Sequence, residues 1–163
     1  MQHHLEFPHG PMRRKEREIK ERSAIDEILS SAKIMHLALS DNNVPFLVPL
    51  HFAFDGGAIY FHSARAGTKI EILKRNNFVC FEICDYRGVA ASPLACDFEA
   101  NHRTVIGLGR ACFIDEESEK IRILNLIVAR FTEEKFTYPK NSLDATLVVR
   151  IDIDSIKGKK HLL

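Results

Sequence analysis

Residues 45–69 constrain the fold of this chain more than any other part of its sequence. They read PFLVPLHFAFDGGAIYFHSARAGTK, two apolar runs separated by Asp55-Gly56-Gly57. Glycine tolerates the positive φ of a tight turn, so this order predicts an antiparallel hairpin. A short helix is expected at residues 66–75, with Ile70 and Leu73 buried. The second strand therefore opens into a helix.

Further segments with strand-like patterning surround this hairpin. We expect about six strands and two or three peripheral helices. The region 86–101 has little periodicity and is predicted to be an irregular excursion. Gly107 and Gly109, two residues apart in one predicted strand, indicate a bend or a close backbone approach. The result is a mainly β fold with peripheral helices in a closed antiparallel barrel. The predicted strands cover residues 33–40, 45–54, 58–63, 78–84, 103–114 and 145–154, and the helices 13–31, 66–75 and 115–131.

Two helices carry an apolar stripe. In the first, Ile25, Ile28, Leu29 and Ala32 follow the i, i+3, i+4, i+7 spacing of one buried face. In the last, Asp115 is the expected N-cap. Ile121, Leu124 and Val128 are its expected buried face.

At 163 residues the chain fits one domain, which we place at residues 13–163, after an N-terminal arm at residues 1–12. The net charge of +1 argues against a nucleic-acid surface. No apolar run is long enough to span a membrane, and the N-terminus lacks the apolar core of a signal peptide. A cytoplasmic protein is expected.

The cysteine and histidine spacings predict no metal site. Cys80 and Cys84 lie on one face of a predicted strand, and the chain has no C-x-x-C pair. We expect all four cysteines to be buried, reduced thiols. The scattered histidines lack the i, i+4 spacing of metal ligands; they are His36, His51, His102 and His161.

Pro49 lies inside an apolar strand, where it donates no hydrogen bond to a neighbouring strand. It therefore belongs at a sheet edge or bulge, where adjacent amides and carbonyls can meet the polar edge of a planar ligand such as isoalloxazine. The alternative is that Pro49 only ends ladder pairing at a barrel rim. Side chains of this strand alternate, with Phe46, Val48, Leu50, Phe52 and Phe54 on one side and Leu47, Pro49, His51 and Ala53 on the other.

The end of the second strand carries anion-binding chemistry. Ser63, Thr68 and Lys69 supply two hydroxyls and a cation near a helix start, and Gly67 permits close approach. The pattern is not a Walker A loop, and it fits a solvated helix start equally well. His62, beside it, suits either proton transfer and anion binding or a structural role.

The chain resembles a known family. The segment VPLHFAFDGGAIYFHSARAGTKIEILKRNNFVCFEI, with MRRKEREI before it and ACDFEANHRTVIGLGRACFID after it, is similar to the FMN-binding split-barrel proteins related to pyridoxamine phosphate oxidase. Within them it is most similar to the branch of the nitroimidazole-resistance (Nim) proteins. The resemblance covers nearly the whole chain after residue 11. It implies a six-stranded antiparallel split β-barrel that forms a homodimer with FMN at the subunit interface.

The resemblance also implies roles for individual residues. Val48, Pro49 and Leu50 would face the isoalloxazine ring. His62 matches a histidine that this branch places near flavin and substrate, which makes it the candidate catalytic residue. The second subunit would contribute from residues 104–110. The positions implied to hold the phosphate arm are Ser63, Ala64, Thr68 and Lys69.

The resemblance does not extend to the substrate. Where Nim-like sequences carry Trp and Tyr, this chain has Phe98 and His102, and it contains no Trp. The implied function is a flavin-dependent oxidoreductase that takes electrons from a nicotinamide donor and passes them to a small acceptor such as a nitroaromatic compound. Two alternatives remain open: a module that binds flavin, haem or a deazaflavin without turnover, and a purely structural dimer. FAD fits the phosphate-binding half as well as FMN does.

Overall fold

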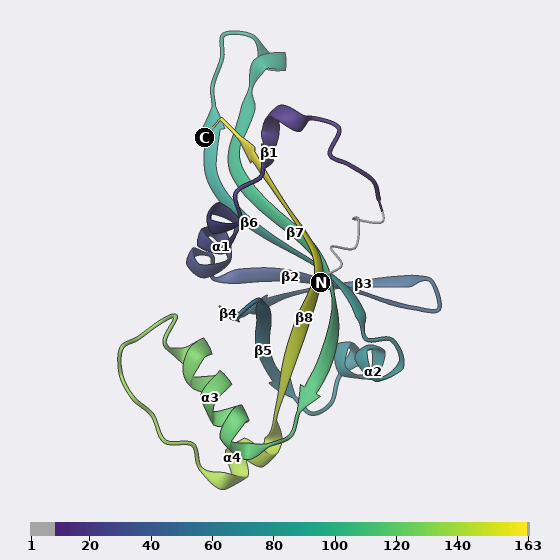
Figure 1. Cartoon of the computed structure of the whole chain (residues 1–163), viewed down its shortest axis with the longest axis vertical. Helices are drawn as coiled ribbons and strands as arrows, with labels where there is room; N and C mark the ends of the chain where they lie inside the picture. Colours follow the sequence, from purple (N-terminus) through teal and green to yellow (C-terminus); the bar gives the residue numbers. More distant parts are fainter. Residues whose placement is uncertain (1–8, 163) are drawn as a thin grey trace.

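The computed structural model describes residues 9–162, so most of the predicted arm at residues 1–12 lies outside the described part of the chain. Antiparallel strands form a single sheet with short helices around it (Figure 1). The strands are β1 (Glu18–Ile19), β2 (Ile34–Asp41), β3 (Val44–His51), β4 (Ala53–Asp55), β5 (Ala58–Ala64), β6 (Phe78–Ala90), β7 (Glu99–Ile114) and β8 (Thr146–His161). The helices are η1 (Lys15–Arg17), α1 (Arg22–Ser31), α2 (Thr68–Arg75), η2 (Ala95–Asp97), α3 (Glu117–Val128) and α4 (Lys140–Ala145), where η denotes a 3₁₀ turn.

The sheet has the order β3-β2-β6-β7-β8-β5-β4, and β1 pairs with β8. Every pairing is antiparallel. The predicted fold class, a mainly β split barrel with peripheral helices, is therefore confirmed. The sheet of the described residues has eight strands, two more than the six expected.

One of the two extra strands arises because the predicted strand at residues 45–54 breaks at Phe52. β3 ends at His51, and β4 begins at Ala53. The predicted alternation of side chains is nevertheless confirmed on both sides of the break. Ala53 packs into a second core cluster, whereas the residues expected on the other side pack against the larger cluster, namely Phe46, Val48, Leu50, Phe52 and Phe54.

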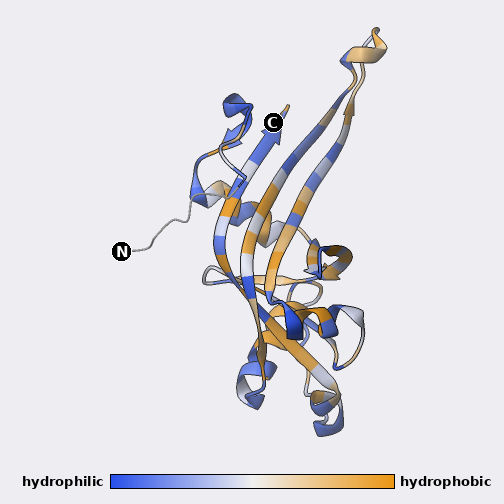
Figure 2. Ribbon diagram, turned by 90° about the vertical axis from the view of Figure 1, so that its right-hand side faces the viewer, coloured by the Kyte–Doolittle hydropathy of each residue, from blue (hydrophilic) through white to orange (hydrophobic). Residues whose placement is uncertain are grey.

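Two apolar clusters form the core, and β5 contributes to both. Alternate residues of β5 point to opposite sides: Ile59 and Phe61 enter the larger cluster inside the barrel, while Ala58 and Tyr60 enter a smaller one beneath α3. Figure 2 shows hydrophobic residues concentrated in the lower part of the sheet, whereas hydrophilic and hydrophobic residues alternate along the long strands above. The end of β5 therefore lies between two packed layers.

A glycine allows close packing inside the barrel. A Cβ atom built on Gly107 in β7 would lie 2.2 Å from Cζ of Phe81 in the paired strand β6. A Cβ on Gly109 would lie 2.4 Å from the carbonyl oxygen of Asp152, beside a shift in the β7–β8 register. The predicted close backbone approach at these glycines is confirmed.

Several predicted boundaries are wrong. The first helix starts at Arg22 rather than at residue 13, because residues 15–19 form η1 and β1. The predicted irregular excursion at 86–101 is largely a hairpin, because β6 runs to Ala90 and β7 starts at Glu99. β8 extends to His161, beyond the predicted end at residue 154.

The first predicted apolar stripe is confirmed, and the second is displaced. Ile25, Ile28 and Leu29 are buried as expected. Glu116, not Asp115, caps α3, since its carboxylate accepts hydrogen bonds from the Ser118 and Glu119 amides. The apolar residues buried by α3 are Ile123, Leu124 and Ile127 rather than the predicted 121, 124 and 128.

The cysteines are free, as expected, but they are not buried. Cys80 is half-buried, while Cys84, Cys96 and Cys112 are exposed. Cys80 and Cys84 do share one face of β6, because the buried residues Phe81 and Ile83 occupy the opposite face. Within residues 9–162, no group of histidine, cysteine and acidic side chains could hold a metal ion, and no helix is long and apolar enough to cross a bilayer.

Candidate functional site

The candidate site is built around the end of β5, where the strand leads into α2. His62 and Ser63 are neighbours in this strand, so their side chains point to opposite faces of the sheet. His62 is exposed on the face that carries Tyr60, and Ser63 is buried on the face that carries Phe61. A ligand that contacts both residues must therefore pass around the end of β5.

Two basic side chains lie near His62. The pKa of His62 is lowered, first by burial of the ring and then by the positive charges of His51 and Lys69. His51 comes from the end of β3, and Lys69 comes from the first turn of α2. Lys69 is half-buried and forms no ion pair with another residue in the described part of the chain. Lys69 thus adds a positive charge beside His62, which favours an anion there.

The other face of β5 holds an unpaired hydroxyl. Ser63 is 8% exposed, and its Oγ has no hydrogen-bond partner among residues 9–162. A buried polar group without a partner costs free energy, so a polar ligand atom at Oγ would be favourable. The N-terminus of α2 follows directly, and no side chain caps it. Its N-cap, Gly67, has φ of 122°, a conformation that favours glycine.

These features fit a phosphate group. A helix N-terminus presents free amides and a partial positive charge, and Lys69 adds a full charge on the same turn. Thr68 is exposed at the first helical position, where its hydroxyl is accessible to a ligand. Ala64 is exposed at the end of β5, on the same face as His62.

The Pro49 strand lies at the edge of the sheet, as predicted. β3 is hydrogen-bonded to β2 on one side and is the terminal strand of the sheet order. The side chains of Val48 and Leu50 are half-buried against the main core, so a ligand at the edge can reach only their backbone groups. Pro49 is exposed. No hydrogen bond joins these three residues to Ser63, Thr68 or Lys69 within residues 9–162. The structure thus brings His62 and Lys69 close to each other and places Pro49 at the free edge of β3.

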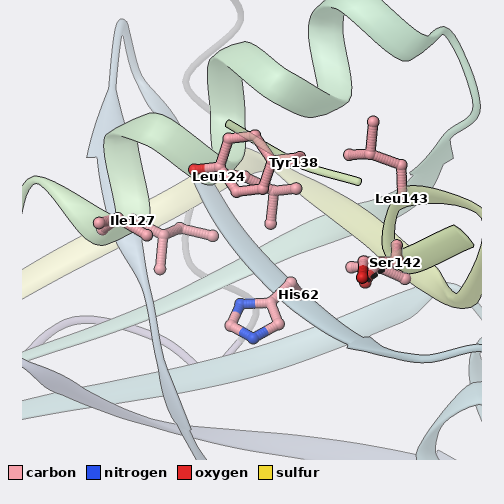
Figure 3. A pocket seen from close by; sticks show the side chains of 8 residues that line it. His62, Leu124, Ile127, Tyr138, Ser142 and Leu143 are labelled. Carbon is pink, nitrogen blue, oxygen red and sulfur yellow. Dashed lines mark hydrogen bonds between the residues drawn. The ribbon is translucent and has the colours of Figure 1, made fainter. Parts of the chain in front are cut away.

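A pocket of about 200 Å³ lies on the His62 side of β5 (Figure 3). It opens between β5, α3 and α4, and its walls are mostly apolar. Sequence reasoning missed it, because its other residues follow His62 by sixty positions or more; the only local signal was the apolar face of α3. The lining residues are His62, Leu124, Ile127, Val128, Tyr138, Ser142, Leu143 and Thr146.

His102 lies among further charged side chains, far along β7. The pKa of His102 is lowered by burial and by the charges of Lys159, His161 and Arg17. His102 is paired in register with His161 and accepts or donates a hydrogen bond at Thr104, 2.9 Å away. Phe98, the other position where the chain departs from the Nim pattern, is exposed.

Comparison with known proteins agrees with this fold. The family model of pyridoxamine 5′-phosphate oxidase matches residues 21–160. No curated protein matches the chain. Among solved structures, a candidate 5-nitroimidazole antibiotic resistance protein from Bacteroides thetaiotaomicron is similar, with 26% identity, a TM-score of 0.78, and coverage of 87% of this chain and 85% of that one.

Two further structures share the fold at lower identity. The flavocytochrome Anf3 from Azotobacter vinelandii has 24% identity and a TM-score of 0.83, covering 94% of this chain and 73% of its own. An FAD- and haem-binding protein from Mycobacterium smegmatis has 19% identity and a TM-score of 0.82, covering 90% and 74%. Because the family model spans nearly all of the described residues, the chain belongs to the pyridoxamine 5′-phosphate oxidase family.

Proposed function

We propose that this chain binds FMN and acts as an oxidoreductase that passes electrons from a nicotinamide donor to a small acceptor. The observation that carries the proposal is the uncapped N-terminus of α2, with Lys69 on its first turn and the unpaired hydroxyl of Ser63 before it. In a chain of this family, that arrangement supports a phosphate-bearing cofactor. Two of the similar structures are a flavocytochrome and an FAD- and haem-binding protein, which supports a flavin.

Different residues would bind the phosphate and the ring system of the cofactor. Lys69 would neutralise the phosphate charge, while Ser63, Thr68 and the amides at the start of α2 would donate hydrogen bonds to its oxygens. Ala64 leaves room beside them. The backbone of Val48, Pro49 and Leu50, at the free edge of β3, would meet the polar edge of the ring system.

His62 is suited to handle a proton. When bound, the flavin would supply the hydride and electron chemistry, and the protein supplies binding and orientation. The lowered pKa of His62 keeps its ring neutral at pH 7, so one ring nitrogen can donate a proton while the other accepts one. Neither Nδ1 nor Nε2 forms a hydrogen bond with another residue in the described part of the chain, which leaves both free for a substrate.

We further propose that two copies of the chain pair through the outer face of the sheet. Large apolar side chains are exposed there: Leu47 at 63% on β3, Ile106 at 40% on β7, and Ile34 and Phe78 on neighbouring strands. Exposed apolar patches mark interaction surfaces. In a homodimer, the second subunit would then complete the cofactor site.

The first test is the visible absorption spectrum of the purified protein, followed by mass analysis of the released chromophore. We expect a flavin spectrum and the mass of FMN. Anaerobic mixing with NADH or NADPH should bleach the flavin, and a nitroaromatic acceptor should restore its colour. A colourless protein that takes up neither FMN nor FAD would refute the proposal. A bound flavin or haem that neither donor reduces would identify a binding module without turnover.

A further inference from the structure

The pocket beside His62 has its own chemistry, distinct from that of a phosphate site. Four of its walls are the apolar side chains of Leu124, Ile127, Val128 and Leu143, which come from α3 and α4 (Figure 3). Such a wall favours an apolar ligand, because burying apolar surface is the main source of affinity in a small pocket.

The polar groups of the pocket are unequally available. The hydroxyl of Tyr138 donates to Oδ1 of Asn125 at 2.9 Å, and that of Thr146 donates to the carbonyl oxygen of Ser142 at 2.8 Å. The ring of His62 and the hydroxyl of Ser142 form no hydrogen bond with other residues within 9–162. A ligand can therefore pair with His62 at one end of the pocket, where Figure 3 shows the ring below the apolar side chains.

The size of the pocket decides what it can hold. Its volume is about 200 Å³. A cavity of about 150 Å³ is enough for benzene, whereas pockets for drug-sized ligands start at about 300 Å³. The three-ring isoalloxazine of a flavin is therefore too large, and a single six-membered ring with a small substituent fits.

The charges near the pocket determine which polar substituent the ligand ring can carry. The groups that act on His62 from neighbouring elements, His51 and Lys69, are basic. A cationic ligand would be repelled, and a fully charged anion would lose its hydration against four apolar walls. A neutral group that accepts a hydrogen bond, such as a carbonyl or nitro oxygen, satisfies both constraints.

We propose that the pocket between β5, α3 and α4 is a binding site for a small, uncharged, single-ring molecule whose hydrogen-bond acceptor pairs with His62. The pocket shares His62 with the proposed flavin-dependent site but is too small for the flavin ring, so its ligand binds whether or not FMN is present. The His62 ring thus donates its hydrogen bond to this ligand, on the α3 side of β5.

The test uses acetophenone and isopropylbenzene, which have similar shapes and differ in the carbonyl oxygen. Each is titrated into the full chain, with and without added FMN, while the methyl resonances of Leu124, Ile127 and Leu143 are followed by NMR. We expect saturable shifts of these methyl groups with both compounds. In His62→Leu, acetophenone should bind about five-fold more weakly, because one hydrogen bond contributes about 1 kcal/mol. The affinity for isopropylbenzene should stay the same, because it makes no hydrogen bond with His62.

A second pair of variants tests the location of the site without changing the core. Ser142 is exposed at the pocket, and its neighbour Asn141 is exposed but does not line it. Ser142→Phe should abolish the shifts, and Asn141→Phe should leave them intact. The proposal is overturned if acetophenone causes no saturable shift, if Ser142→Phe binds it normally, or if FMN displaces it. None of these results depends on whether the chain reduces anything, so a failure here is distinct from failure of the proposed oxidoreductase activity.

Discussion

The pKa of His62 depends on its surroundings and not on a hydrogen bond to another residue within 9–162. Burial and the nearby positive charges of His51 and Lys69 disfavour the protonated ring, so its pKa is lowered below the ordinary value of 6.5. Burial is the largest cause of the lowered pKa of His62, and the neighbouring basic residues add to it.

This lowered pKa makes the stability of the protein dependent on pH. The unfolded chain takes up a proton at His62 near pH 6.5, whereas the folded chain takes it up only at a lower pH. Stability contributed at His62 is therefore fully present above pH 6.5, falls as the pH drops below that value, and levels off below the folded pKa. We expect the wild type to lose more stability than His62→Gln between pH 7.5 and pH 5 in urea unfolding.

The comparison isolates His62, because His102, whose pKa is also lowered, is present in both proteins. Equal pH dependence of the free energy of unfolding in the two proteins would show that the fold does not disfavour the charged His62 ring.

Lys69 is the residue on which the phosphate assignment depends most. Lys69→Met should weaken FMN binding about ten- to a hundred-fold, because a charge-assisted hydrogen bond contributes about 1.5–3 kcal/mol. Lys74→Met, on the exposed side of the same helix, removes an equal charge that pairs with Glu71. We expect it to leave FMN affinity nearly unchanged in fluorescence titrations. Equal losses in the two variants would mean that only net charge matters.

At the scale of elements, the local features were predictable and the long-range ones were not. The hairpin β4–β5 follows from Asp55-Gly56-Gly57, and both glycines do have positive φ. α2 and the buried Ile70 also follow from local spacing. The sequence did not predict the end of the β6–β7 hairpin, because its residues form no single apolar face. Tyr86 and Val89 are exposed there and flank a shift in register.

The same distinction applies to the candidate site. His62 and Lys69 lie seven positions apart in the sequence, so their proximity could be predicted from the strand-to-helix order. Strand alternation alone was also sufficient to show that Ser63 faces away from His62. The pocket formed with α3 and α4 could not be foreseen, because it depends on how β8 pairs with β5 and carries α4 to it.

The contact between β6 and β7 makes a sharp prediction about packing. Gly107→Ala places a methyl group against the ring of Phe81, and overpacking of this kind costs about 1–3 kcal/mol. We expect a lower midpoint in urea unfolding. Phe81→Leu should itself be destabilising, because it leaves a cavity.

The double variant Gly107→Ala/Phe81→Leu tests the cause. If the methyl group and the ring compete for one space, the double variant should be more stable than the sum of the two single effects predicts. Simple additivity would show that the cost of Gly107→Ala comes from the strand backbone instead.

At the scale of the whole molecule, the exposed outer face of the sheet predicts self-association. Ile106→Asp should give monomers in light scattering, because a charge buried in an apolar interface has no partner. If a second copy completes the cofactor site, this variant should also lose bound flavin. Phe136→Asp is a matched control, since Phe136 is similarly exposed but lies outside the sheet. A flavin-loaded Ile106→Asp monomer would contradict the shared site.

The position of β8 in the sheet has a consequence for protein synthesis. This strand, the last in chain order, pairs with β1, β5 and β7, so it joins segments that leave the ribosome long before it does. Until residues 146–161 have emerged, β5 and β7 each lack a neighbour and expose unpaired amides and carbonyls to other chains. We therefore expect a chain truncated before β8 to aggregate in size-exclusion chromatography rather than to form a smaller barrel.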